Sequence, residues 1–148
     1  MSVVEVETEI AAPIDEVFNL AMDPARTPEW VTIALAVKDV KGDPTKKGFE
    51  MKQRLCLRGV PFWVEWHLVE ADAPTFARYE GRGPMRSKAI IENRLSERDG
   101  KTVYRYKNEF KAPFGPLGST AEKVLAGGVP EKEARASLAK LKALAEKG

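Results

Sequence analysis

The chain opens with Val3-Val4-Glu5-Val6-Glu7-Thr8-Glu9-Ile10, followed by Ala11-Ala12-Pro13-Ile14-Asp15-Glu16-Val17-Phe18-Asn19-Leu20 and, further on, by Asp23-Pro24 and Pro28-Glu29-Trp30. The alternation of apolar and polar residues over 3–10 predicts a β-strand. Pro13 suits the first turn of a helix, where its missing N–H group would have no intrahelical partner. The apolar residues of 14–21 recur at helical spacing, so we expect a short amphipathic helix that Asp23-Pro24 ends. A second helical turn is expected over 26–30.

The C-terminal part of the chain predicts a long amphipathic helix over 117–147. Its apolar stripe contains Leu117, Ala121, Val124, Leu125, Leu138, Leu141 and Ala145. Gly127-Gly128 and Pro130 interrupt this stripe, and a proline inside a helix removes a hydrogen bond and clashes with the preceding turn. We therefore expect a kink or a break near 127–130, with Pro130 opening the final segment.

Candidate strands fill the space between these ends, at 33–41, 48–58, 62–71, 75–81, 86–97 and 101–111. Short turns such as Asp99-Gly100 join them, and strands joined by short turns pair as antiparallel neighbours. The sequence therefore predicts an α+β fold. Residues 3–111 form a bent antiparallel sheet with two short helices after its first strand, and the C-terminal helix packs across the concave face.

Alternation within the strands assigns one face to the interior. In 62–68 the inner set is Phe62, Val64, Trp66 and Leu68, and the outer set is Trp63, Glu65 and His67. In 101–111 the inner set is Thr102, Tyr104, Tyr106, Asn108 and Phe110, whereas Val103, Arg105, Lys107 and Glu109 face away. The inner face is thus apolar with a few hydroxyl and amide groups, and each of these needs a partner when buried.

This mixture is typical of a ligand pocket, which is mostly apolar with a few polar groups that orient the ligand. We predict that the ligand-binding residues are Trp30, Met51, Gln53, Trp66, Tyr79, Asn93, Tyr104, Tyr106, Phe110, Phe114 and Leu125. Trp30, the turn at 81–85 and the segment 113–118 are expected to form the mouth. Plain core packing remains the other interpretation of any single member of the set.

Length and charge exclude several classes of function. The chain has 148 residues, and we expect residues 1–148 to form a single domain with a sizeable core. The net charge of +2 argues against a nucleic-acid partner. Cys56 is the single cysteine, which excludes an internal disulfide and fits a reducing, cytoplasmic location. No apolar run is long enough to span a membrane.

Catalytic signatures are weak. His67 is the only histidine and falls on the outer face, so it is a poor candidate for a general base. Cys56 has no evident paired base. No His/Cys cluster at ligand spacing, phosphate-binding loop or dinucleotide motif occurs. We therefore expect neither a metal ion nor a cofactor.

The order of elements resembles the START-related, birch-pollen-allergen-like superfamily (SRPBCC), and within it the polyketide cyclase/dehydrase-like branch. The resemblance covers essentially the whole chain and is carried by Ile10-x-Ala12-Pro13-x-x-x-Val17-Phe18, Asp23-Pro24, Pro28-x-Trp30 and Phe114-Gly115-Pro116-Leu117-Gly118. It implies a helix-grip fold, in which a bent sheet wraps around a long C-terminal helix and leaves a hydrophobic pocket. Members range from lipid and hormone carriers to cyclases, hydrolases and toxin-like proteins.

We therefore expect the protein to bind a small hydrophobic or amphipathic ligand, lipid-like or polyketide-like, in an internal cavity. A cofactor-independent cyclase or dehydratase is the first alternative, with Tyr104, Tyr106 or Asn93 positioning a carbonyl group. That alternative needs a titratable group inside the pocket, and the strand pattern provides none. A toxin-like or interaction protein that acts through its surface is the second alternative.

Overall fold

The computed structural model describes residues 2–57, 59–111 and 129–147. Within these residues one antiparallel sheet has seven strands in the order β1-β7-β6-β5-β4-β3-β2. The strands are β1 (Ser2–Ile10), β2 (Ala34–Lys41), β3 (Glu50–Leu57), β4 (Val60–Asp72), β5 (Phe76–Arg82), β6 (Lys88–Arg98) and β7 (Lys101–Lys111). Strands β2 to β7 follow one another as a meander. The last strand, β7, lies next to the first strand, β1, and pairs with it.

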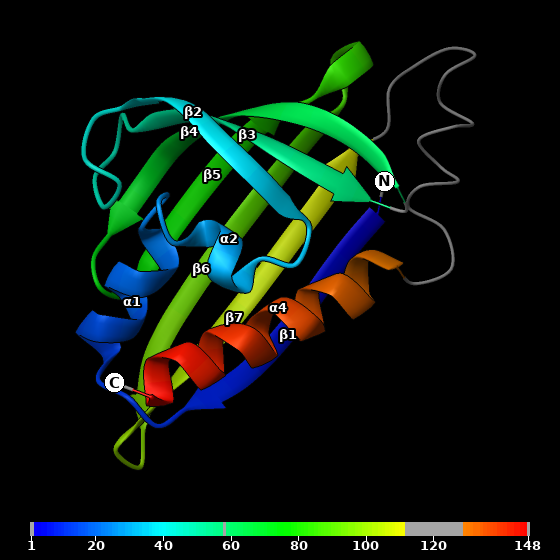
Figure 1. The fold of residues 1–148 in the computed structure, drawn as a ribbon. Coiled ribbons are helices and arrows are strands. Elements are labelled where there is room, and N and C mark those ends of the chain that lie inside the picture. Colours follow the sequence, from blue (N-terminus) through cyan, green and yellow to red (C-terminus); the bar gives the residue numbers. More distant parts are fainter. Residues whose placement is uncertain (1, 58, 112–128, 148) are drawn as a thin grey trace.

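Helices cover the concave side of this sheet (Figure 1). Helices α1 (Ile14–Met22) and α2 (Thr27–Trp30) follow β1, and α4 (Val129–Glu146) packs against β1, α1 and α2. A short 3-10 turn, η1 (Pro84–Arg86), precedes β6. The predicted helix-grip architecture is therefore confirmed. The interruption expected at 127–130 falls mostly outside the described residues, and Pro130 lies in the first described turn of α4. No described helix combines the length and the apolarity needed to cross a membrane.

Two of the predicted turns are shorter than expected. Val60 and Pro61 already belong to β4, where they pair with Leu57 and Cys56 of β3. Proline is tolerated at the start of a strand, which explains why β4 can begin before Pro61. Gly81, expected at the beginning of a turn, lies inside β5 and pairs with Trp66 and Ala89.

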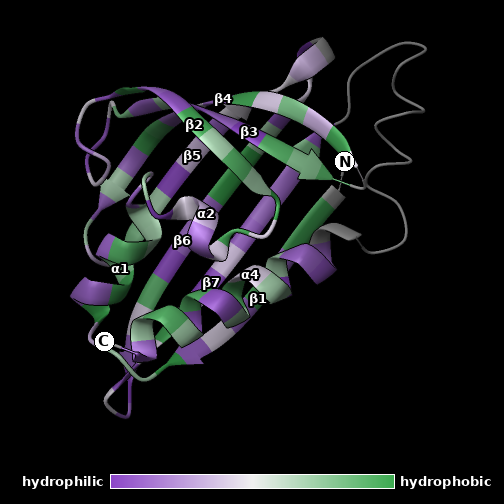
Figure 2. Ribbon diagram, viewed as in Figure 1, coloured by the Kyte–Doolittle hydropathy of each residue, from purple (hydrophilic) through white to green (hydrophobic). Residues whose placement is uncertain are grey.

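The predicted faces of β4 are confirmed. Val64, Trp66 and Leu68 are at most 5% exposed, whereas Trp63 is 39% exposed. Figure 2 shows the same alternation of hydrophobic and hydrophilic residues along the strands that face α4. The buried residues of the strands therefore point toward α4, and the interior lies between the concave face and this helix. Side chains that alternate between the two faces of a sheet produce such a buried face.

Val103 is an exception on β7. It has the outward parity of Arg105 and Lys107, yet it is only 3% exposed. In the register it lies beside Glu9 of β1 and Ser96 of β6. Glu9 also carries ion pairs to long side chains nearby, and the apolar stems of such side chains cover neighbouring surface. We attribute the burial of Val103 to this cover.

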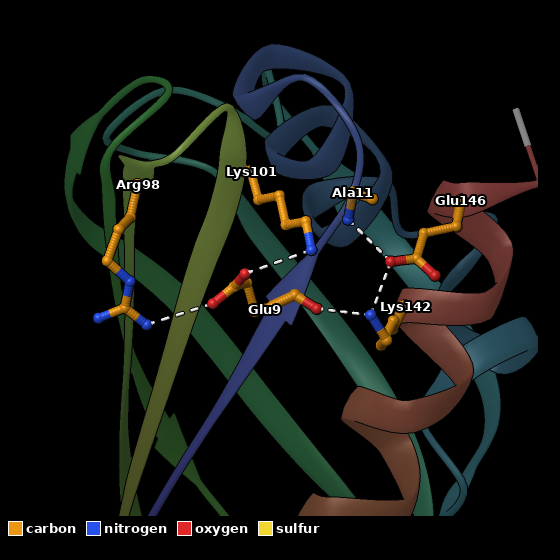
Figure 3. A network of polar contacts seen from close by, with 6 residues as sticks. All are labelled: Glu9, Ala11, Arg98, Lys101, Lys142 and Glu146. Carbon is orange, nitrogen blue, oxygen red and sulfur yellow. Dashed lines mark hydrogen bonds and ion pairs between the residues drawn. The ribbon is translucent and has the colours of Figure 1, made fainter.

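A polar network ties the end of α4 to the end of β1 (Figure 3). The Glu146 carboxylate accepts hydrogen bonds from the backbone N–H of Ala11 and from Lys142 Nζ, each at 2.7 Å. Lys142 Nζ also donates to the backbone carbonyl of Glu9 at 2.7 Å. The Glu9 carboxylate in turn pairs with Arg98 and Lys101 of the β6–β7 hairpin, at 3.3 and 3.6 Å. This network links the end of α4 to the end of β1 and to the β6–β7 hairpin.

Candidate functional site

The amide groups at the centre of the concave face are bonded to aromatic side chains. Trp66 Nε1 donates a hydrogen bond to Gln53 Oε1 at 3.0 Å. The Tyr104 hydroxyl donates to Asn93 Oδ1 at 2.6 Å, and Asn93 Nδ2 donates to the Ala77 carbonyl at 3.4 Å. These side chains are all buried. The two amide oxygens and the two aromatic donors therefore satisfy one another, as is usual for polar atoms in a sealed core.

Tyr79 and Met51 belong to the same central region. The Tyr79 hydroxyl donates to Met22 Sδ at 3.1 Å, and its ring meets that of Trp66 edge-on with 6.3 Å between centroids. Burial raises the pKa of both Tyr79 and Tyr104 far above the usual value. Both phenols are thus neutral hydrogen-bond donors and not proton acceptors. Met51 is half-buried and packs against this core.

A pocket of about 60 Å³ lies to one side of this centre, beneath α4. It is bounded by α4, by the end of α2 with the segment leading to β2, and by strands β1, β3 and β7. Its lining residues are Val4, Trp30, Val31, Ile33, Leu57, Tyr106, Asn108, Phe110, Glu133, Ala134, Ser137 and Leu138. One water needs about 10–15 Å³ measured in this way, so the pocket holds a few waters or a small organic group.

Two of the lining residues carry buried polar atoms that have no partner among the described residues. These atoms are Trp30 Nε1, a donor, and Asn108 Oδ1, an acceptor, and their residues are only 6% and 7% exposed. The other end of the Asn108 amide, Nδ2, donates to the Tyr106 hydroxyl at 2.8 Å. Burial raises the pKa of Tyr106 to about 12, although the hydrogen bond from Asn108 acts in the opposite direction. The Tyr106 phenol is therefore neutral, and its own proton has no acceptor among the described residues.

Polar residues of α4 hold the chain between α2 and β2 against the pocket. The backbone N–H of Thr32 donates to Ser137 Oγ at 3.0 Å, and the Thr32 hydroxyl donates to the Glu133 carboxylate. The neighbours of Thr32 in sequence, Val31 and Ile33, line the pocket. This contact, which we call the Thr32 latch, links α4 to the segment that covers the pocket.

The sequence interpretation missed Glu133, Ser137 and Asn108 as members of the site. The strand pattern puts Asn108 on the inner face, but the predicted set of ligand-binding residues does not include it. Glu133 and Ser137 are four residues apart, and Ser137 precedes Leu138 of the apolar stripe by one position. That spacing puts them at the edge of the buried helix face, which is the signal that could have identified them.

The predicted ligand-binding residues divide into separate groups. Trp30, Tyr106 and Phe110 come together at the pocket. Others lie elsewhere on the concave face, in the buried core or packed against it, namely Met51, Gln53, Trp66, Tyr79, Asn93 and Tyr104. Phe114, Leu125 and the predicted mouth segment 113–118 lie outside the described residues. Gly81, Arg82, Gly83 and Pro84 of the predicted mouth are not among the described lining residues. A role in ligand binding stays a prediction for the residues beyond the pocket.

His67 lies on the outer face, as predicted. Its ring nitrogens are 3.2 and 3.1 Å from carboxylate oxygens of Glu50 and Glu65, and its side chain is 38% exposed. Neither carboxylate lines the pocket beneath α4. Among the described residues, no three His, Cys, Asp or Glu side chains gather closely enough to hold a metal ion.

Solved structures with the same fold are numerous, but they are distant in sequence. A conserved protein from Geobacillus kaustophilus has a TM-score of 0.77 at 15% identity, with 99% of this chain and 96% of that chain covered. A protein from Thermus thermophilus has a TM-score of 0.76 at 14% identity, with 96% and 95% covered. Ara h 8.0201 has a TM-score of 0.67 at 15% identity, with 99% of both chains covered. At these identities the likeness shows the fold alone.

No curated protein matches the chain in sequence. A family model does, and its description is polyketide cyclase / dehydrase and lipid transport. The match covers residues 1–146, which includes every strand and helix described above. The chain therefore belongs to the polyketide cyclase/dehydrase and lipid transport family, within the START-related, birch-pollen-allergen-like superfamily.

Proposed function

We propose that the protein binds a small hydrophobic or amphipathic molecule, lipid-like or polyketide-like, in the pocket beneath α4. The observation that carries this proposal is the composition of the lining. Apolar side chains from the sheet, the α2–β2 segment and α4 converge there. The polar groups among them are Trp30, Tyr106, Asn108, Glu133 and Ser137. An apolar wall with a few oriented polar groups is the usual form of a small-molecule site.

Burial of apolar ligand surface supplies the affinity. Each Å² removed from water contributes about 25 cal/mol, from which the cost of association must be subtracted. A ligand larger than a few waters needs the pocket to widen. The half-buried Val31 and Ile33 next to the Thr32 latch are the lining residues whose displacement would disturb the core least.

Binding of naphthalene, followed by ¹H–¹⁵N NMR, tests the proposal. We expect resonances of the lining residues to shift, and Phe110→Ala to change the affinity more than Lys107→Ala. Phe110 lines the pocket, whereas Lys107 faces outward and pairs with Glu109 at 3.5 Å. The stability of both variants must be compared, because truncating an aromatic side chain also removes core contacts. If naphthalene does not bind, or if only Lys107→Ala weakens its binding, the proposed pocket is wrong. An interaction protein that acts through the outer face of the sheet would then be the better hypothesis.

A cyclase or dehydratase activity is a second candidate, and Glu133 favours it. Glu133 lines the pocket, so it provides the titratable group that the strands do not. In such a reaction its carboxylate would remove a proton from a carbon next to a carbonyl group. The neutral Tyr106 hydroxyl would stabilise the enolate oxygen by donating a hydrogen bond. Loss of turnover of a poly-β-keto thioester in Glu133→Gln, with binding of naphthalene retained, would support this candidate.

We also propose a cytoplasmic location. The single cysteine, Cys56, is free, which suits a reducing compartment. Localisation of the tagged full chain by cell fractionation tests this point.

A further inference from the structure

We propose that the pocket beneath α4 selects neutral ligands that carry a hydroxyl or carbonyl group and rejects anionic ligands such as fatty acids. This inference rests on the proposed function, because it specifies the ligand class of the same pocket. It follows from two independent observations, namely the unpartnered polar atoms of the lining and the sign of its charge.

The first observation concerns hydrogen bonding. Trp30 Nε1 and Asn108 Oδ1 are buried next to the pocket without partners among the described residues. A buried donor or acceptor that lacks a partner costs free energy, and a ligand that provides the partner recovers it. The Tyr106 hydroxyl already accepts from Asn108 Nδ2 and retains a proton to donate. The residues that line the pocket thus carry two donors and one acceptor. A ligand hydroxyl group can accept from a donor and donate to Asn108 Oδ1, whereas a ligand carbonyl oxygen can only accept from the donors.

The polar groups at the centre of the concave face do not offer a comparable set. Gln53 Oε1 accepts from Trp66, and Asn93 Oδ1 accepts from Tyr104. A ligand that displaced these partners would break one buried hydrogen bond for each one it made. Trp30 and Asn108 at the pocket beneath α4 are therefore the residues that can select a ligand by hydrogen bonding.

The second observation concerns charge. Glu133 is the only carboxylic acid in the described lining, and the described lining contains no lysine, arginine or histidine. A ligand carboxylate would lose its hydration and approach the Glu133 carboxylate without a compensating cation in the described lining. Both effects disfavour an anion inside a protein. A neutral ligand has neither penalty.

Three compounds of one shape test the inference at pH 7, namely naphthalene, 2-naphthol and 2-naphthoate. We expect 2-naphthol to bind about fivefold to tenfold more tightly than naphthalene, the effect of about one net hydrogen bond. We expect 2-naphthoate to bind at least about tenfold more weakly than 2-naphthol. The indole N–H resonance of Trp30, assigned with Trp30→Phe, should shift with 2-naphthol more than the indole resonance of Trp66, whose N–H is already bonded to Gln53.

Glu133→Gln isolates the charge. It keeps an oxygen that can accept from Thr32, so the fold is expected to remain intact. In this variant the affinity for 2-naphthoate, relative to that for 2-naphthol, should rise about tenfold. Glu131→Gln is the matched control, because Glu131 lies in the same helix on the exposed side and pairs with Arg135 at 2.8 Å. It should change neither affinity.

The possible outcomes distinguish a failure of ligand selection from a failure of the proposed binding function. If the wild-type protein binds 2-naphthoate as tightly as 2-naphthol, or if Glu133→Gln leaves their ratio unchanged, selection for neutral ligands is wrong and the proposed function stands. If none of the three compounds binds to the wild-type protein, the proposed function itself fails.

Discussion

The benzene ring of Trp66 lies directly against the backbone of Gly81 in the neighbouring strand. A Cβ atom added at Gly81 would be 2.4 Å from Trp66 Cζ3 and 2.5 Å from Cε3. The two residues pair across β4 and β5, and Trp66 is only 4% exposed. Because its indole N–H is bonded to Gln53, the ring has little freedom to withdraw. Gly81 therefore makes room for one of the two buried tryptophans of the core.

Gly81→Ala is expected to destabilise the protein. The added methyl group overlaps a buried ring, and overpacking of a core costs about 1–3 kcal/mol. Urea denaturation measures the change in the free energy of unfolding. In a Trp66→Leu background the same substitution should cost much less, because the overlapping ring is gone. Equal costs in the two backgrounds would mean that the ring is not the reason for the glycine.

Tyr104→Phe is expected to cost more than Tyr79→Phe. The first substitution leaves the buried Asn93 Oδ1 without its donor at 2.6 Å, and an unsatisfied buried acceptor costs about 1–3 kcal/mol. The second removes only a hydrogen bond to Met22 Sδ, and a thioether sulfur is a weak acceptor. Both phenols are buried, so the pair is matched for hydrophobic effects. Thermal and urea denaturation of both variants tests the order, and a larger loss in Tyr79→Phe would contradict it.

The contact of Glu146 with Ala11 is expected to make stability depend on pH. The hydrogen bond from the Ala11 N–H, followed by that from Lys142, lowers the pKa of Glu146 below its ordinary value of 4.5. A carboxylate whose pKa is lower in the folded state stabilises the fold above the unfolded pKa. That contribution is lost as the pH falls through the folded-state value. Glu146→Gln should therefore flatten the decline of the unfolding free energy below about pH 4.5.

Glu29→Gln serves as the control for this effect. The pKa of Glu29 is also lowered, but its partner Arg26 is only three residues away in the sequence. A pair so close in sequence is partly kept in the unfolded chain, so it contributes less to the difference between the two states. Glu146 and Ala11 are 135 residues apart. A pH profile that flattens as much in Glu29→Gln as in Glu146→Gln would refute the role of the long-range contact.

Thr32→Val is expected to loosen the segment that covers the pocket. Valine has nearly the shape of threonine but cannot donate to Glu133 or contact Ser137 Oγ, which lies 3.3 Å from the Thr32 hydroxyl. The loss should be about 0.5–1.5 kcal/mol, with faster amide exchange over residues 31–34. Thr45→Val is the control, since its hydroxyl bonds Asp43 in an exposed loop. Unchanged exchange at 31–34 in Thr32→Val would show that the latch does not hold this segment.

Much of the fold could be predicted because its signals are local. The alternation of apolar residues in β1, β4 and β7 specifies a strand and its buried face within a few residues of sequence. Pro13 and Asp23-Pro24 bracket α1 for equally local reasons. Val103 departs from its parity, which we attribute to cover by the long side chains that pair with Glu9 of the neighbouring strand.

By itself the sequence determined the order of the elements, the inward faces of the strands and the apolar nature of the interior. The tertiary structure decided which inner polar groups are satisfied. It pairs Gln53 with Trp66 and Asn93 with Tyr104, and it leaves atoms of Trp30 and Asn108 unpartnered. It also brings Glu133 of α4 to Tyr106 of β7 at one pocket. The physical reason is that parity reports only the side of a strand, whereas a hydrogen bond depends on distances between segments far apart in the chain.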